Sequence, residues 1–124
     1  MSEPYIVTYT GRRFYPFAPR VEDVYIEDIA HALSMQCRFS GHTRCFYSVA
    51  EHSILVAENC PPEEKLLGLL HDAAEAYLQD MASPIKHSGR IEGYLEAEEK
   101  IGAVIAERFG LQSLHKTVSV LKAE

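Results

Sequence analysis

The sequence lacks the features that mark several classes of protein. It contains no run of roughly eighteen apolar residues, so nothing in it predicts a membrane span. Its first residues have neither the basic nor the apolar stretch of a secretory signal peptide, and we therefore expect a cytoplasmic protein. The three cysteines are odd in number and form no CxxC pair, which argues against both a disulfide framework and a zinc knuckle.

Basic residues are also in the minority. Twelve Lys and Arg against eighteen Asp and Glu give a net charge of -6, which argues against binding of long nucleic acids, because such binding requires a basic face. The charge is uneven, however: the window from Ile29 to Ala50 has no acidic residue, and it contains Arg38 and Arg44. This window could receive a small anion, but on charge alone a solvated basic loop is the favoured explanation.

The length and the pattern of residues predict one domain, residues 1–124, with an all-α fold and a short N-terminal β-hairpin. Residues rich in β-formers lie on both sides of Gly11 and predict a strand pair over residues 5–17, within a β appendage of residues 1–20. Residues 26–124 form the predicted helical core.

Helical spacing of apolar residues divides this core into five predicted helices, over about 26–36, 48–59, 62–78, 91–109 and 114–124. Ser48 and Glu51 fit a capping box, and Pro62 suits the first turn of the next helix. Ser83-Pro84 is predicted to interrupt the chain, and Gly110 to end the helix before it.

Titratable side chains follow the apolar stretch at residues 66–70 of the third predicted helix. These are His71, Asp72 and Glu75, with Asp80 shortly after. Burying such groups unpaired costs roughly 2–7 kcal/mol each, so they need partners. A divalent metal would satisfy His71 and Asp72 together. Glu75 is four residues after His71, on the same helix face, where it could orient or deprotonate a water molecule.

His52 is the best candidate for a further ligand. It lies in the preceding predicted helix, flanked by apolar residues, and that helix is expected to pack antiparallel to the next. Nitrogen and oxygen ligands admit manganese, cobalt, iron, zinc or nickel. Taken alone, a His-Asp pair occurs often by chance, and helix capping or a salt bridge is its more usual explanation. His31, His87 and His115 are interpreted as surface or packing histidines.

Three separated blocks of the sequence resemble the HD-domain phosphohydrolases, and within them the 5′-deoxynucleotidase branch and its nucleoside-triphosphate-cleaving relatives. The similarity extends from about residue 28 onward, and its blocks are Tyr47-Ser48-Val49-Ala50-Glu51-His52-Ser53, His71-Asp72-Ala73-Ala74-Glu75, and Asp80 with Pro84 and Lys86.

This resemblance implies an HD-domain helical bundle in which His52, His71 and Asp72 bind one divalent metal ion. It implies that Glu75 acts on the attacking water, and that Asp80 contacts the sugar or helps to hold that water. It further implies that an arginine, either Arg38 or Arg44, faces the phosphate. Lys86 would add positive charge there.

The sequence departs from the family at one point. The family completes its metal site with an aspartate on a late helix, near a Lys-x-Ala-Asp-like sequence. This chain reads Leu121-Lys122-Ala123-Glu124 and stops. Either Glu124 takes the place of that aspartate, or the sequence is a fragment that lacks the end of the last helix.

The expected function is therefore metal-dependent hydrolysis of phosphate from a nucleotide, with a deoxynucleoside mono- or triphosphate as the expected substrate. The alternative is a catalytically impaired nucleotide-binding or interaction module with the same fold. The missing late aspartate favours this alternative, whereas the presence of Glu75 and Asp80 favours the enzyme. The expected partner is a small nucleotide, and the apolar helix over 91–109 could supply the face of a homodimer or a larger homo-oligomer.

Overall fold

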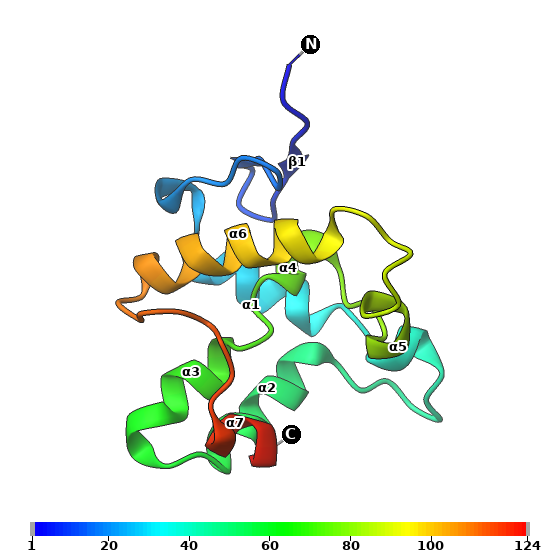
Figure 1. Cartoon of the computed structure of the whole chain (residues 1–124), viewed down its shortest axis with the longest axis vertical. Helices are drawn as coiled ribbons and strands as arrows, with labels where there is room; N and C mark the ends of the chain where they lie inside the picture. The colour runs from blue at the N-terminus through cyan, green and yellow to red at the C-terminus, as the bar shows by residue number, and fades with distance from the viewer. Residues whose placement is uncertain (1, 124) are drawn as a thin grey trace.

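The structure is a computed structural model that describes residues 2–123, except for the side chain of Val118. It is mostly helical with a short antiparallel hairpin at the N-terminus, which confirms the predicted fold class (Figure 1). Its elements are β1 (Ile6–Val7), β2 (Arg13–Phe14), η1 (Val21–Asp23), α1 (Ile26–Ser34), η2 (Phe39–Gly41), α2 (Val49–Glu58), η3 (Pro62–Glu64), α3 (Lys65–Leu70), α4 (Glu75–Leu78), α5 (Ser83–Lys86), α6 (Tyr94–Arg108) and α7 (Val118–Ala123). Within residues 2–123, none of the helices has the length and apolarity needed to cross a membrane.

The N-terminal hairpin covers one side of the main core. Its two strands pair around a turn at Gly11, whose φ of 85° suits a residue without a side chain. Phe14 of β2 is fully buried and stacks on Tyr77 of α4, with the ring centroids 3.6 Å apart. Asp28 of α1 is also buried, and its carboxylate accepts hydrogen bonds from the amide and the hydroxyl of Thr10. The hairpin is therefore attached by both an aromatic contact and a satisfied buried carboxylate.

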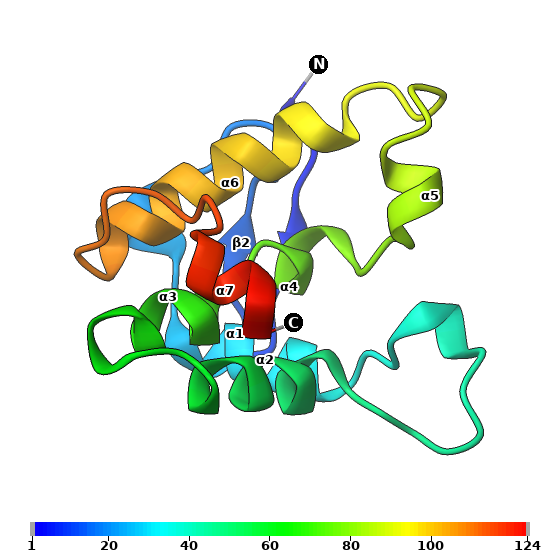
Figure 2. The ribbon, with the colours of Figure 1, turned by 60° about the horizontal axis from the view of Figure 1, so that its bottom comes forward.

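Two apolar clusters hold the helices together. The larger joins the hairpin, α1, α4 and α6 with Val49 of α2 and Leu70 of α3, and includes the fully buried Ile101 and Ile105 of α6. The smaller joins α2 and α7 through Val56, Cys60 and Val120, with Leu67 of α3 packed against them. Figure 2 shows α6 on one side of the molecule and α2 with α3 on the other, with α4 between them. Helix α3 therefore contacts both clusters, with Leu67 at the smaller one and Leu70 in the larger one.

The helix predicted over 91–109 is present as α6, with slightly shorter bounds. It begins after Gly93, which has a φ of 84°, and it is followed by Gly110, which has a φ of 77°. The Leu111 amide donates to the Ala106 carbonyl at 2.8 Å, which is the bond expected where a left-handed glycine ends a helix. The buried side of α6 faces the main core, so most of the apolar stripe predicted for this helix is used within the chain.

The prediction of a single helix over 62–78 was wrong, because the structure divides this segment into η3, α3 and α4. Between α3 and α4, the amides of Ala73 and Glu75 donate to carbonyls only three residues earlier. The Gly68 carbonyl, which a continuing α-helix would offer to the Asp72 amide, accepts a hydrogen bond from the His71 ring. A side chain that competes for a backbone acceptor in this way weakens and bends the helix at that point.

Two smaller predictions were also wrong. Ser83-Pro84 does not interrupt the chain but begins the short helix α5, because a proline in the first turn loses no helical hydrogen bond. The last helix begins at Val118 and not at Leu114. Thr117 precedes it, and its hydroxyl accepts from the Val120 amide at 3.3 Å, as a residue that caps a helix does.

Candidate metal centre

Three side chains from neighbouring segments meet at one point. His52 comes from α2, and His71 and Asp72 come directly after α3. One possible ligand atom from each lies within 4.8 Å of the other two. Asp72 Oδ2 is 3.0 Å from His71 Nε2 and 3.6 Å from His52 Nε2. Both histidines are buried, and the group could hold a metal ion.

The orientation of the His71 ring fits such an ion. Its Nδ1 donates a hydrogen bond to the Gly68 carbonyl, which leaves Nε2, the nitrogen that faces Asp72, as the one that would bind an ion once it has lost its proton. Histidines that bind metals commonly have their other ring nitrogen held by a backbone carbonyl in this manner. The ring planes of His52 and His71 are 67° apart, so their nitrogens approach the shared carboxylate from different directions. Two imidazoles and a carboxylate suit a divalent transition-metal ion.

Close packing of α2 against α3 sets the distance between these ligands. A Cβ atom on Gly68 would lie 2.8 Å from Cys60 Sγ and 3.3 Å from Ala57 Cα, so a side chain here would force the thiol or the backbone of α2 to shift. At the start of α2, the predicted cap is confirmed: Ser48 Oγ accepts from the Glu51 amide at 3.0 Å. This cap fixes the first turn of the helix immediately before His52.

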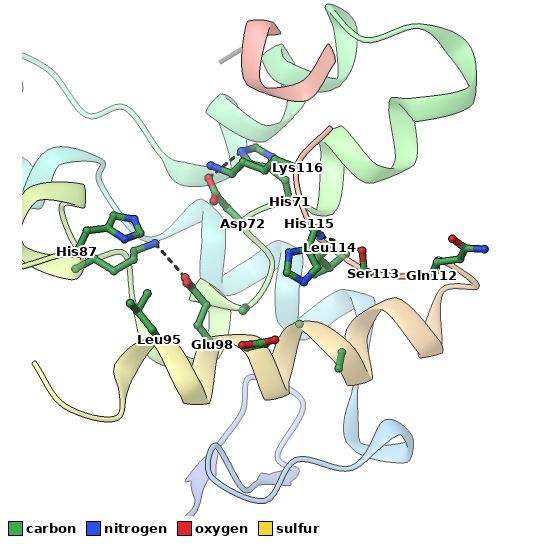
Figure 3. Close-up of a pocket in the computed structure, with 15 residues that line it drawn as sticks. His71, Asp72, His87, Leu95, Glu98, Gln112, Ser113, Leu114, His115 and Lys116 are labelled. Atoms are coloured by element: carbon green, nitrogen blue, oxygen red, sulfur yellow. Dashed lines mark hydrogen bonds and ion pairs between the residues drawn. The ribbon is translucent and has the colours of Figure 1, made fainter. Parts of the chain in front are cut away.

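The charge on Asp72 is maintained despite its burial. Burial disfavours the carboxylate, but a hydrogen bond from His71 and the positive charges of His71, Lys116 and His52 outweigh that effect and hold the pKa of Asp72 below its ordinary value. Lys116 lies beside Asp72 and His71 in Figure 3. The site therefore presents an ionised carboxylate that is already stabilised by positive charge.

Glu75 has the opposite tendency. Only 3 % of it is exposed, and burial together with the neighbouring carboxylates of Asp72 and Asp80 raises the pKa of Glu75 to about 10. Lys86 acts in the other direction but is too weak to reverse the shift. Three carboxyl groups thus lie close together in a largely buried place, where a cation would offset their mutual repulsion.

A cavity of about 550 Å³ opens beside His71 and Asp72. Its other walls come from α5, α6 and the segment over 112–116 (Figure 3). Lys86 lines the cavity, as expected for a residue near the substrate, and its Nζ is 3.0 Å from Glu98 Oε2. His87 and His115 are exposed, as the interpretation of them as surface histidines expects, but both also line this cavity.

The two arginines of the acid-free window lie elsewhere. Arg44 is exposed in the loop between η2 and α2, and Arg38 is half-buried, with its guanidinium 4.6 Å from the centre of the Phe39 ring and 5.3 Å from that of Tyr47. Within the described part of the chain, neither is among the residues that line the cavity beside Asp72. Their contact with phosphate remains a prediction.

The end of the chain approaches the same region. Helix α7 packs against α2, and Ala123 is in contact with the small core that contains Val56 of α2 (Figures 1 and 2). Glu124, the predicted replacement for the late aspartate of the HD-domain family, lies outside the described residues.

One residue close to the site had no signal in the sequence. Gln36 follows α1, and its side-chain amide donates to the Glu75 carbonyl at 2.9 Å and accepts from the Asp80 amide at 2.9 Å. These partners are 39 and 44 residues further along the chain, so no local pattern could reveal the contact.

Replacement of Gly68 tests how the ligand spacing is set. We expect Gly68→Ala to lower the free energy of unfolding by about 1–3 kcal/mol, because the new Cβ overlaps Cys60 and the backbone of Ala57. The helices must then separate, and we expect the affinity for Mn²⁺, measured by calorimetric titration, to fall about tenfold or more. Gly102→Ala is the matched control, since a Cβ there meets only ordinary contacts at 3.8 Å or more. Unchanged affinity in Gly68→Ala would contradict this role.

The raised pKa of Glu75 predicts a pH-dependent effect on stability. In the unfolded chain this carboxyl ionises near its ordinary pKa of about 4.3, whereas in the folded, metal-free protein it keeps its proton to about pH 10. The folded state therefore binds more protons between these values, and the free energy of unfolding falls as the pH rises through them.

Glu75→Gln removes this titration. We expect the metal-free variant to exceed the parent in stability by about 1–3 kcal/mol at pH 8 and by less at pH 5, as measured by urea unfolding with a chelator. Glu107→Gln, on the exposed side of α6, is the control. A difference between Glu75→Gln and the parent that does not change with pH would show that Glu75 is not buried as a proton-bearing carboxyl.

Comparisons with known proteins extend over most of the chain. No protein-family model matches it. The chain is 43% identical over 113 residues to the uncharacterized protein YfdR of Escherichia coli K12. The matched region covers 91% of this chain and 62% of that protein. It is 40% identical over 115 residues to the uncharacterized protein RCAP_rcc00048 of Rhodobacter capsulatus, which covers 85% of this chain and 58% of that protein. The chain thus spans about three fifths of the length of each relative.

Proposed function

We propose that this protein is a metal-dependent phosphohydrolase of the HD-domain type, which hydrolyses phosphate from a nucleotide, most simply a deoxynucleoside mono- or triphosphate. The observation that carries the proposal is the meeting of His52, His71 and Asp72 at one point, next to the buried carboxyl of Glu75. A structural His-Asp pair would not require a second histidine from another helix or a second carboxyl group nearby.

His52, His71 and Asp72 would hold a divalent ion: manganese, cobalt, iron, zinc or nickel all accept this set of ligands. Such an ion supplies positive charge that stabilises the phosphoryl oxygens and makes a coordinated water more acidic. Three protein ligands leave positions for that water and for the substrate, as in catalytic metal sites generally.

Glu75 is proposed to take the proton of the attacking water. As the water oxygen bonds to phosphorus, the bond from phosphorus to the leaving oxygen breaks; that oxygen takes a proton from solvent, and Glu75 releases to solvent the proton that it took from the water. A base must be ionised, and the pKa of about 10 in the metal-free protein is too high for this at neutral pH. Positive charge beside Asp72 would lower it, because it would offset the repulsion between the neighbouring carboxylates.

The phosphate would be met by basic side chains. Lys86 lines the cavity beside Asp72 and supports this role directly, although Glu98 now shares its charge. Arg38 and Arg44 belong to the window without acidic residues, which an anionic substrate would prefer. Asp80 would contact the sugar or help to hold the water.

A phosphate-release screen over nucleoside mono-, di- and triphosphates, with each candidate metal, tests the proposal. We expect release that depends on added metal and stops with a chelator. Glu75→Gln should lose about 10²–10⁴-fold in rate while it keeps its metal, because a general base contributes about that much. His71→Ala should lose both metal and rate. Glu107→Gln is the control with an unchanged rate.

Metal content and initial rates should be measured on the same samples. Full activity of Glu75→Gln would remove Glu75 from the chemistry, and loss of its metal would make Glu75 a ligand. Binding of nucleotide without turnover by the parent, under every metal, would favour the impaired binding module over the enzyme.

A second prediction concerns the arginines. Arg38→Ala and Arg44→Ala are made separately. The variant that lacks the arginine facing the phosphate should show a Michaelis constant raised by about tenfold or more, because a charge-assisted contact to the substrate is lost. The control is Arg90→Ala, which also removes a guanidinium but from the exposed loop before α6. If Arg38→Ala and Arg44→Ala both behave like Arg90→Ala, the acid-free window is not part of the substrate site.

A further inference from the structure

We propose that Gln36 is a positioning residue, which holds the segment from Glu75 to Asp80 in a fixed place relative to the metal-binding helix α2. The inference rests on the proposed function, because Glu75 and Asp80 are the groups to which that function assigns the work on water and substrate. Gln36 itself lies outside that chemistry.

The side chain of Gln36 is hydrogen-bonded to both ends of the Glu75–Asp80 segment. Its Nε2 donates to the Glu75 carbonyl and its Oε1 accepts from the Asp80 amide, each at 2.9 Å. A planar amide can satisfy a donor and an acceptor at once only when the two are held at a matching separation. Gln36 therefore fixes the distance between the backbone positions that carry the two carboxyl groups.

The backbone of the same residue fixes the start of α2. The Val49 amide, in the first residue of that helix, donates to the Gln36 carbonyl at 2.9 Å. His52 lies one turn further along α2. Three hydrogen bonds of Gln36 therefore link the start of α2, which carries His52, to the segment from Glu75 to Asp80.

The segment needs such support because its backbone is strained. Gln79 has a φ of 84° and a ψ of 150°, a conformation that residues other than glycine rarely adopt. Strain of this kind persists only where the surroundings determine it. Here Gln36 holds the amide that follows Gln79, and the Tyr94 hydroxyl donates to the Gln79 carbonyl at 2.6 Å. Release of either contact would let the backbone relax and move Asp80.

Gln36 acts on Glu75 and Asp80 through their backbone atoms, and within residues 2–123 it is not among those that line the cavity beside Asp72. It is therefore placed to set geometry and not to transfer a proton. Displacement of a reacting group by about 1 Å can lower a rate by about 10²-fold, even when binding is preserved. A positioning role thus predicts a loss of turnover without an equal loss of affinity.

The test compares Gln36→Met, which removes both side-chain hydrogen bonds, with Gln36→Glu, which keeps an acceptor for the Asp80 amide. The control is Asn59→Ala, which removes another bond from a side-chain amide to the backbone, at the opposite end of α2. Each protein is measured with Mn²⁺ for kcat, KM and metal affinity, and the hydrogen exchange of the Asp80 amide is followed by NMR.

We expect Gln36→Met to lose about 10–100-fold in kcat, with KM and the Mn²⁺ dissociation constant within about threefold of the parent. Exchange of the Asp80 amide should rise about tenfold or more, since its acceptor is gone. Gln36→Glu should restore the protection of this amide and recover part of kcat. Asn59→Ala should match the parent in every measurement.

A kcat of Gln36→Met within twofold of the parent would overturn the inference, as would a loss of metal affinity that parallels the loss of kcat. If the parent releases no phosphate with any nucleotide and metal, the proposed function fails separately. The exchange measurement then decides for Gln36: unchanged protection of the Asp80 amide in Gln36→Met would overturn its link to the segment, and lost protection would support it.

Discussion

The close approach of α3 to α2 at Gly68 is the contact on which the candidate site depends. The missing side chain lets Gly68 lie against Ala57 and Cys60, and so sets the separation of the two helices. The carbonyl of the same residue accepts a hydrogen bond from the His71 ring, and so orients a proposed ligand. The bond lies where α3 ends, and beyond it Asp72 lies 3.6 Å from His52 and Glu75 begins a new helix in the main core.

The charges at the site follow from this geometry. Asp72 stays ionised because histidines and Lys116 surround it, whereas Glu75 is pushed toward its neutral form by burial and by Asp72 and Asp80. A buried carboxyl with this shift reduces the stability of the metal-free protein above its ordinary pKa. Such an arrangement is typical of functional sites, where stability is given up for reactivity. The strained backbone at Gln79, held by Gln36 and Tyr94, fits the same pattern.

Elements with local signals could be predicted from the sequence. Ser48 marked the start of α2, Gly11 the hairpin turn and Gly110 the end of α6, since each acts on its own backbone or on that of its nearest neighbours. The break after α3 could not be predicted, because hydrophobic spacing carries no information about a side chain that takes a backbone acceptor.

The candidate site divides in the same way. The blocks around His52 and His71 identified the cluster that could hold a metal ion, because each block is continuous in sequence. The wall formed by residues 112–116 was missed, since a helix was expected over most of it. Gln36 was missed because its partners come from distant parts of the chain.

Crystals grown with saturating Mn²⁺, with anomalous difference density calculated at the manganese edge, test the central claim most directly. The account predicts one strong peak at bonding distance from His52 Nε2, His71 Nε2 and an Asp72 carboxylate oxygen, and loss of that peak in crystals of His71→Ala. A strong peak bound elsewhere on the chain, with these three side chains left in contact only with one another, would contradict it.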